Sequence, residues 1–282
     1  MSDAHDAAPP ALAPLREAAS ALPAAPGVYT FHGDAAHMPL YIGKSVNLRS
    51  RVLAHLRAAD EARMVGQTRR ISHIRTAGDL GAQLLEAQLI KQQQPLFNQR
   101  LRRNRQLCAW HLADGVPRLA HANAVNFATT PHLYGLYASR HAALEGLMAL
   151  ADQHGLCHGV LGLEKLPAGK PCFRHMVKRC AGACCGKEAV DAHFTRLLAA
   201  LENLQVACWP HPGAVAVQET CPLDPAFHQF HVVRNWCYLG SAPTLAQARR
   251  LDRVAAAFDA DGYKILCKPL LQGAATVVVL KA

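Results

Sequence analysis

The chain has 282 residues and lacks any apolar run that approaches the roughly 20 residues needed to span a bilayer. It also lacks the start of a secretory signal peptide, because residues 1–6 are acidic and the first basic residue is Arg16. Hydrophobic residues make up 51% of the chain, which excludes global disorder. These features predict a folded protein of the cytoplasm.

Acidic residues are scarce, with 20 Asp and Glu against 30 Lys and Arg. The imbalance is local, because residues 41–105 hold 13 basic and 4 acidic residues and so carry +9 of the net charge of +10. A basic segment of this kind attracts a polyanion, for which nucleic acid is the first candidate. Charge alone is equally consistent with a solvated basic face kept for solubility.

Hydrophobic patterning predicts a small α+β unit over residues 23–105. Two short apolar runs at 27–31 and 39–42 predict an antiparallel hairpin, and 71–76 predicts a third strand. Ser45 or Asn47 can cap the helix that follows the hairpin. Thr76 and Asp79 have the spacing of a capping box, which predicts a second helix that ends before Pro95.

The rest of the chain predicts further mixed structure, so the expected fold class is α+β. A strand pair is expected at 107–119, helices at 142–156, 188–206 and 244–258, and strands at 214–218, 230–239 and 276–280. Asp261-Gly262 predicts a turn before another strand. The expected organisation is a flexible or partly helical tail at 1–22, the unit at 23–105, a linker with a cysteine-rich helical region at 106–208, and a C-terminal α+β domain at 209–282.

The basic segment also carries residues suited to phosphodiester cleavage. That reaction needs a base for the attacking water and positive charge on the phosphorane. An ammonium such as Lys44 would lower the pKa of Tyr41, and Arg51 has a fork suited to phosphate oxygens. Glu86 is the single acidic residue between 80 and 105, and a carboxylate suits Mg²⁺ or Mn²⁺. Taken singly, each of these residues is more simply a packing or surface residue.

Together, the motifs resemble the GIY-YIG nuclease family. Its two tripeptides appear as Gly27-Val28-Tyr29 and Tyr41-Ile42-Gly43, and the match continues in order and spacing through Phe97-Asn98. The resemblance implies a small nuclease domain with short antiparallel strands flanked by helices. It implies catalytic roles for seven residues: Tyr29, Tyr41, Lys44, Arg51, His55, Glu86 and Asn98.

The resemblance also implies what these residues do. Glu86 would bind Mg²⁺ or Mn²⁺, and Tyr41 is a candidate base, aided by Lys44. Tyr29 would position the water, although which tyrosine takes the proton stays open. Arg51 and His55 would contact the scissile phosphate, while Asn98 braces the site. The basic residues expected to contact DNA are Lys44, Arg49, Arg51, Arg57, Lys91, Arg100, Arg102 and Arg103.

Five of the ten cysteines fall within 29 residues, with the spacing Cys157-x14-Cys172-x7-Cys180-x3-Cys184 and Cys185 adjacent. Without an export signal, clustered cysteines suggest a metal site rather than disulfides. Four thiolates can hold zinc or an iron–sulfur cluster, although the spacing does not match zinc ribbons, and four incidental cysteines remain an alternative. Six neighbouring basic residues argue against burial and favour thiolates.

The cysteine segment resembles that of the UvrC excinucleases, in which the matching four cysteines are implicated in a 4Fe–4S cluster. The resemblance therefore favours iron–sulfur, with zinc as the alternative. Ala183 stands where proline is usual and Cys185 is additional, so either Cys184 or Cys185 could be the fourth ligand.

Residues 213–270 resemble the short UvrC homologues of the Cho family, and the chain shows none of the additional domains of the longer UvrC proteins. This resemblance implies a nuclease without a nucleotide cofactor of its own. It would nick lesion-containing double-stranded DNA once, on the 3′ side, after UvrA has loaded UvrB. The alternatives are a sequence- or structure-specific GIY-YIG nuclease that does not need UvrB, and a non-catalytic DNA-binding protein with a metal-stabilised fold.

Overall fold

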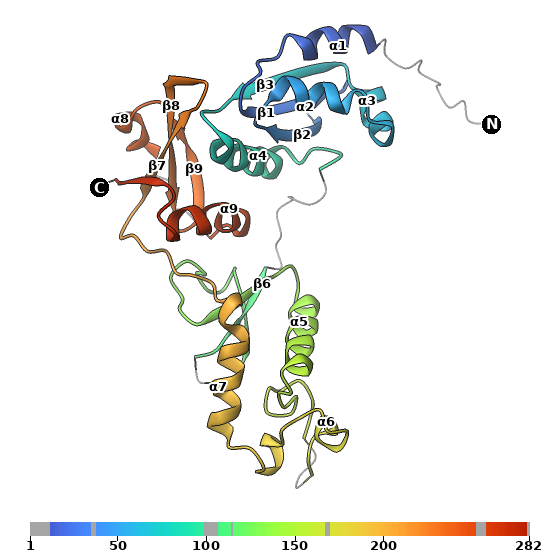
Figure 1. Ribbon diagram of the computed structural model, residues 1–282, viewed down its shortest axis with the longest axis vertical. Helices are drawn as coiled ribbons and strands as arrows, with labels where there is room; N and C mark the ends of the chain where they lie inside the picture. Colours follow the sequence, from blue (N-terminus) through green and yellow to red (C-terminus); the bar gives the residue numbers. More distant parts are fainter. Residues whose placement is uncertain are drawn as a thin grey trace, which may run out of the picture. The chain divides into compact units, whose positions relative to one another are not determined.

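The computed structural model describes residues 12–34, 38–98, 107–113, 115–166, 170–251 and 258–280. The chain divides into two compact units, one formed by residues 1–103 and 211–282 and the other by residues 104–210. The first unit contains two antiparallel sheets, here called the nuclease-domain sheet and the C-terminal sheet, and the second unit contains one (Figure 1). Helices accompany all three sheets, which confirms the expected α+β class.

The nuclease-domain sheet has the strand order β2-β1-β3, and all its pairs are antiparallel. The expected hairpin and third strand are therefore confirmed. The elements are α1 (Leu12–Ser20), β1 (Gly27–His32), β2 (Pro39–Ser45), α2 (Leu48–His55), the 3₁₀ turn η1 (Ala59–Glu61), α3 (Ala62–Gln67), β3 (Arg70–Arg75) and α4 (Asp79–Gln93).

Successive side chains of β1 point to opposite faces of the sheet, so this domain has one apolar core on each face. Tyr29 and Phe31 pack on one face with apolar residues of α1, α2 and α3. Val28 points to the other face, where it packs with Ile42 and with the apolar side of α4. The sheet thus lies between α4 and the other three helices (Figure 1), as expected for strands whose side chains alternate between faces.

The two helix starts predicted for this domain have different outcomes. Asn47 caps α2 as expected, since its side chain accepts a hydrogen bond from the amide of Ser50 at 3.0 Å. The capping box predicted at Thr76 does not form. The Thr76 hydroxyl donates instead to the carbonyl of Gly78, and Gly78 is itself the N-cap residue of α4. A glycine offers no side-chain acceptor, so the amides of the first turn of α4 need a partner from elsewhere.

The C-terminal sheet has the order β10-β7-β8-β9, again antiparallel throughout. Its elements are β7 (Val215–Cys221), β8 (Asp224–Arg234), β9 (Cys237–Ala242), α8 (Leu245–Ala248), α9 (Ala260–Leu271) and β10 (Thr276–Val279). Thr244 caps α8, but that helix is much shorter than the expected 244–258, and residues 252–257 lie outside the described part.

Two expectations for this region are wrong. The run 230–239 is not one strand but the hairpin of β8 and β9, because Asn235 and Trp236 form a turn with positive φ angles of 53° and 63°. The segment after Asp261-Gly262 is the helix α9 rather than a strand. Gly262 is needed there for close packing, since a Cβ at this position would lie less than 3.0 Å from the carbonyl oxygen of Trp236.

The second unit combines a three-stranded sheet with helices. The sheet has the order β5-β4-β6, and the predicted strand pair at 107–119 is confirmed by β4 and β5. The third strand, β6, was not predicted. The elements are β4 (Cys108–His111), β5 (Arg118–His121), β6 (Leu133–Tyr137), α5 (Arg140–Gln153), α6 (Phe173–Met176), the 3₁₀ turn η2 (Ala183–Cys185), α7 (Val190–Leu201) and the 3₁₀ turn η3 (Glu202–Leu204).

Candidate active site and cysteine cluster

Three aromatic rings from three elements meet on the α2 face of the nuclease-domain sheet. Tyr29 comes from β1, Tyr41 from β2 and His55 from the last turn of α2. The ring centre of His55 lies 5.4 Å from that of Tyr29 and 5.5 Å from that of Tyr41, and the two tyrosine rings are 6.2 Å apart. The fold therefore brings together residues that lie up to 26 positions apart in the sequence.

The glycines of the two tripeptides permit this close packing. A Cβ on Gly43 would lie 2.5 Å from Cζ of Tyr29 and 2.8 Å from Cε1 of Tyr41. A Cβ on Gly27 would lie 2.9 Å from Leu48 and still closer to the carbonyl oxygen of Ile74 on β3. Any larger residue would displace one of these aromatic rings or a neighbouring strand, which gives a physical reason for glycine at both positions.

A hydrogen-bonded chain runs from Tyr29 through His55 to Glu61. The Tyr29 hydroxyl lies 2.5 Å from Nε2 of His55, and Nδ1 of His55 contacts the carboxylate of Glu61 in η1. Burial lowers the pKa of His55, although Glu61 opposes the shift, so the ring is neutral at pH 7. Since the carboxylate needs a donor, the proton lies on Nδ1, and Nε2 accepts from the tyrosine.

This arrangement refines the sequence-based expectation for His55 and adds Glu61 to the site. His55 is only 2% exposed and uses both ring nitrogens within the protein, so it lies beside Tyr29 rather than on the surface that meets a phosphate. Glu61 was not anticipated. It follows His55 by six residues in a 3₁₀ turn, and the sequence offers no signal that separates it from the adjacent Asp60.

The pKa values of both tyrosines lie above the ordinary range. Burial is the main cause of the raised pKa of Tyr29, and the neighbouring Tyr41 adds to it. Burial also raises the pKa of Tyr41, as does Glu86, whereas Arg51 opposes the rise. The cation that favours the Tyr41 phenolate is therefore Arg51, whereas the sequence suggested Lys44.

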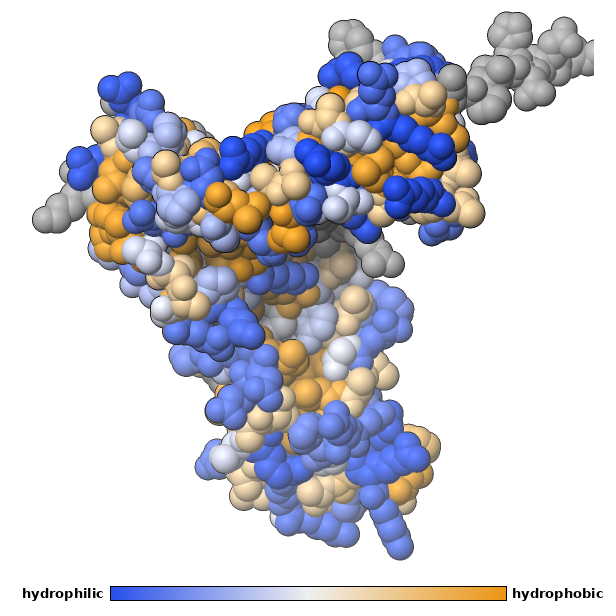
Figure 2. All heavy atoms as spheres, turned by 45° about the horizontal axis from the view of Figure 1, so that its top comes forward, coloured by the Kyte–Doolittle hydropathy of each residue, from blue (hydrophilic) through white to orange (hydrophobic). Residues whose placement is uncertain are grey.

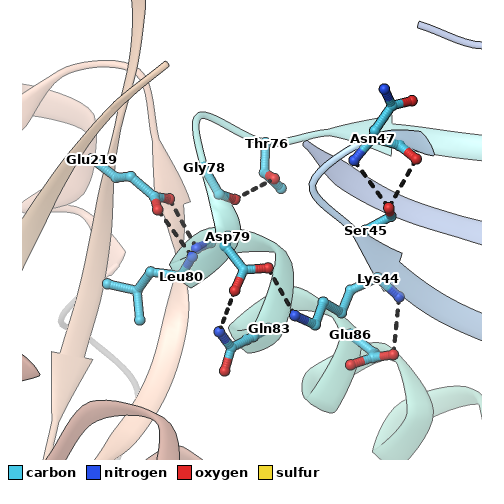
Figure 3. Close-up of polar contacts among 11 residues, drawn as sticks. Lys44, Ser45, Asn47, Thr76, Gly78, Asp79, Leu80, Gln83, Glu86 and Glu219 are labelled. Atoms are coloured by element: carbon cyan, nitrogen blue, oxygen red, sulfur yellow. Dashed lines mark hydrogen bonds and ion pairs between the residues drawn. The ribbon is translucent and has the colours of Figure 1, made fainter. Parts of the chain in front are cut away.

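Glu86 projects from α4 toward the backbone of β2. Its Oε1 accepts a hydrogen bond from the amide of Lys44 at 3.0 Å, and burial raises its pKa while that bond opposes the rise (Figure 3). In the described part of the chain, Oε2 has no hydrogen-bond or ion-pair partner, which leaves it available to a cation. The Lys44 ammonium forms its ion pair with Asp79 at 2.8 Å, and its charge also opposes the rise in the pKa of Glu86.

Asn98, which follows α4 in the sequence, binds β2 through its side chain. Its side chain accepts from the amide of Ile42 at 2.9 Å and donates to the carbonyl of the same residue at 2.8 Å. The side chain thus continues the sheet pairing at the residue between Tyr41 and Gly43. These two bonds tie the loop after α4 to the middle of β2.

The eight residues predicted to contact DNA fall into four groups. Lys44 is partly buried, and its ammonium is bound to Asp79. Arg49, Arg51 and Arg57 project from or just beyond α2 and are exposed, and Figure 2 shows strongly hydrophilic residues on the visible face of this domain. Lys91 is mostly buried and forms ion pairs with Asp259 and Asp261. Three others lie outside the described residues: Arg100, Arg102 and Arg103.

Four cysteines of the second unit form a compact cluster. The sulfur atoms of Cys157, Cys172, Cys180 and Cys184 all lie within 4.8 Å of one another. Cys185 is exposed, and its sulfur lies near the carbonyl oxygen of Gly182 instead. The geometry therefore assembles the set that includes Cys184.

The cluster is more buried than the surrounding charges suggested. Cys157, Cys172 and Cys180 are buried and Cys184 is partly buried, so the argument from nearby cations against burial is wrong. The sulfurs turn inward while exposed basic side chains such as Lys178 and Arg179 turn outward. Burial raises the pKa of the Cys172 thiol, so a bound cation would have to displace its proton.

The donor set fits a metal centre. Backbone amides of Cys172, His175 and Gly182 lie 3.3 Å from sulfurs of the cluster, which is how proteins orient and stabilise thiolate ligands. The sulfurs of Cys157 and Cys172 are 3.8 Å apart. Tetrahedral zinc with bonds of about 2.3 Å separates its sulfur ligands by about 3.8 Å, whereas a four-iron cluster needs them further apart.

Three family models match the chain and together cover most of it. The UvrC-like GIY-YIG domain matches residues 25–99, the middle domain of UvrC/Cho excinucleases matches residues 99–203, and the C-terminal domain of excinuclease Cho matches residues 214–282. In the described part of the chain, no helix is both long and apolar enough to cross a membrane.

Curated relatives agree with these matches. The excinuclease Cho of Salmonella typhi is 56% identical over 94% of this chain and 90% of its own length, and that of Escherichia coli K12 is 57% identical over 92% and 87%. The UvrABC system protein C of Natronomonas pharaonis is 31% identical over 64% of this chain and 31% of its own length. The magnesium-bound GIY-YIG domain of UvrC from Thermotoga maritima is 30% identical, with a TM-score of 0.29 over 30% of this chain and 97% of that domain. The chain therefore belongs to the Cho excinucleases, endonucleases of DNA repair that carry a UvrC-like GIY-YIG domain.

Proposed function

We propose that this excinuclease makes one metal-dependent incision on the 3′ side of a lesion, in double-stranded DNA that UvrA and UvrB have marked. The observation that carries the proposal is the convergence of Tyr29, Tyr41, His55 and Glu86 on one nuclease-domain sheet. This is one phosphodiesterase centre, which suits one cut. Its place of action would be the bacterial cytoplasm, at the nucleoid.

Glu86 is the residue that would hold the catalytic Mg²⁺ or Mn²⁺. Its free Oε2 and its partly buried position suit a hard cation that keeps several waters and phosphate oxygens as further ligands. When bound, the cation supplies positive charge for the phosphorane. The exposed guanidinium of Arg51 would bind a phosphate oxygen beside it.

The chain Tyr29–His55–Glu61 would move the proton. As the Tyr29 oxygen takes a proton from the attacking water, its own proton passes to the neutral Nε2 of His55. The Glu61 carboxylate holds the imidazole in the required tautomer and stabilises the imidazolium that forms. Tyr41 lies within reach of the same ring and is the alternative base.

The test of this function is nicking of a lesion-containing duplex in the presence of UvrA, UvrB, ATP and Mg²⁺. The proposal expects one nick at a fixed distance 3′ of the lesion, which Glu86→Gln abolishes. Equal cutting of undamaged DNA without UvrB would instead support a sequence- or structure-specific GIY-YIG nuclease.

We also infer that the four-cysteine cluster holds a metal centre. Resemblance to the UvrC cysteine segment supports a 4Fe–4S cluster, whereas the sulfur spacing supports a single zinc ion. Anaerobic purification distinguishes them, because an iron–sulfur protein is brown and absorbs visible light, while a zinc protein is colourless with one zinc per chain. A colourless protein without stoichiometric metal would refute both.

A further inference from the structure

The first turn of α4 is capped by a residue of the C-terminal sheet. Glu219 on β7 accepts a hydrogen bond from the amide of Leu80 through Oε1 and from the amide of Gly81 through Oε2, each at 2.9 Å (Figure 3). The N-cap residue Gly78 contributes no side-chain bond. A carboxylate at this end of a helix satisfies free amides and complements the positive end of the helix dipole.

The glycines of this turn allow the carboxylate to approach. A Cβ on Gly78 would lie 2.5 Å from Cδ of Glu219 and closer still to Oε1. A Cβ on Gly81 would lie 2.5 Å from Cε1 of His231 and 3.1 Å from Oε2 of Glu219. Both positions therefore exclude any side chain as long as Glu219 holds its place.

Glu219 is itself held by a buried polar network. His231 is 0% exposed, and its Nε2 lies 2.9 Å from Oε2 of Glu219. On its other side, Nδ1 of His231 lies 2.7 Å from the hydroxyl of Ser241, which lies 2.6 Å from that of Tyr238. Burial alone would raise the pKa of Glu219, but the bonds from His231 and the α4 amides outweigh it and lower the pKa, so the carboxylate is ionised.

A second contact holds the opposite end of α4. The ammonium of Lys91 contacts Asp259 and lies 2.7 Å from Asp261, and both aspartates belong to the start of α9. Burial acts against the charged ammonium, but the two carboxylates outweigh it and raise the pKa of Lys91. The helix is therefore fixed near both ends by elements of the C-terminal sheet region.

Glu86 lies midway between these contacts, five residues after Gly81 and five before Lys91. Asp79, in the turn that Glu219 caps, binds the ammonium of Lys44, whose backbone amide binds Glu86. A shift of the first turn of α4 would therefore move both the metal-binding carboxylate and the strand segment that holds it. Charge-assisted hydrogen bonds and a helix cap are the interactions that resist such a shift.

We infer that Glu219 is a positioning residue for the nuclease centre: by capping α4 together with His231, it fixes where Glu86 presents its carboxylate. The C-terminal sheet is thus a structural part of the active site. This inference rests on the proposed use of Glu86 as the metal ligand.

The test compares Glu219→Gln with Asp224→Asn in the full-length protein. Glutamine has the same shape but one acceptor oxygen, so it cannot serve Leu80, Gly81 and His231 together. Asp224 is the matched control, because it also joins the C-terminal sheet to the nuclease domain, through Arg75 on β3 at 3.5 Å, without touching α4.

Three readouts separate positioning from folding. Amide hydrogen exchange should become about tenfold faster at Leu80 and Gly81 in Glu219→Gln, as expected for a lost cap. Electron paramagnetic resonance would give the Mn²⁺ concentration that half-saturates the protein, and this concentration should rise several-fold in Glu219→Gln. The kcat of nicking should fall, while the KM for DNA should stay unchanged. Asp224→Asn should leave all three as in the wild type.

Faster exchange at Leu80 and Gly81 with unchanged Mn²⁺ binding and unchanged kcat would overturn the inference, because Glu219 would then serve folding alone. Unchanged exchange would overturn it as well. Failure of the proposed function looks different. If the wild type does not nick UvrB-marked DNA, Mn²⁺ binding in the wild type, Glu86→Gln and Glu219→Gln still decides whether Glu219 positions Glu86.

Discussion

Replacing Gly43 by alanine should damage catalysis far more than folding. The new Cβ would lie 2.5 Å from Cζ of Tyr29, whereas ordinary contacts begin at 3.4 Å, so the rings must separate by about 1 Å. A misplacement of about 1 Å in a catalytic group can cost on the order of 100-fold in rate. Overpacking of a core typically costs about 1–3 kcal/mol, which a folded domain tolerates.

The assay for this prediction is single-turnover nicking of UvrB-marked DNA, with thermal unfolding of the same preparation. Gly43→Ala should lose about 100-fold in rate while still unfolding cooperatively. The matched control is Gly66→Ala in α3, where a Cβ would meet nothing within 4 Å and should stabilise the helix by about 0.5–1 kcal/mol. A Gly43→Ala protein that nicks within threefold of the wild-type rate would refute the assembly of the two tyrosines described above.

Three further predictions concern single side chains. Glu86→Gln should reduce the rate of nicking at least about 1,000-fold. It should not lower the melting temperature, because burial disfavours the ionised carboxylate that the substitution removes, and a destabilised variant would contradict this. Burial lowers the pKa of His55, so the unfolded chain binds its proton more readily, and stability should fall as the pH drops below about 6.5. His55→Gln should flatten that decline in urea unfolding between pH 7 and pH 5, and an unchanged slope would argue against a neutral, buried His55. Cys172→Ser should remove the bound metal and lower the melting temperature of the second unit, whereas retention of full metal content would exclude Cys172 as a ligand.

Local sequence signals were sufficient where local interactions decide the structure. Asn47 caps α2 through a bond to a residue three positions away, and β1 pairs with β2, the next strand along the chain. The spacing of the tyrosines, His55 and Glu86 also identified side chains that the fold brings to one sheet. These relations depend on short sequence separations or on a family pattern, so a single sequence reveals them.

Nonlocal contacts explain what the sequence did not reveal. Thr76 has the spacing of a capping residue, yet the acceptor for the start of α4 is Glu219, 139 residues after Leu80. Asp261-Gly262 has the composition of a turn, yet Gly262 lies in α9, where only a glycine fits against the backbone of Trp236. In each instance a tertiary contact outweighs the local preference, and the flanking residues do not indicate which distant residue makes that contact.

The cysteine cluster shows the same limit in a different way. The spacing left Cys184 and Cys185 as alternatives for the fourth position, and the fold brings the sulfur of Cys184 together with those of Cys157, Cys172 and Cys180. Neighbouring cations suggested that the cysteines are exposed. Side chains on one short segment can point to opposite sides, however, so charged residues nearby in the sequence do not indicate whether a cysteine is buried. Which metal the sulfurs would suit depends on their separation, which only the folded chain defines.

The most direct measurement is the position of the nick on an end-labelled duplex with one defined lesion, incubated with UvrA, UvrB, ATP and Mg²⁺. The account predicts a single product, cut at a fixed distance on the 3′ side of the lesion, that requires UvrB and disappears with Glu86→Gln. Cutting that ignores the lesion, or that persists without UvrB or without the Glu86 carboxylate, would contradict it.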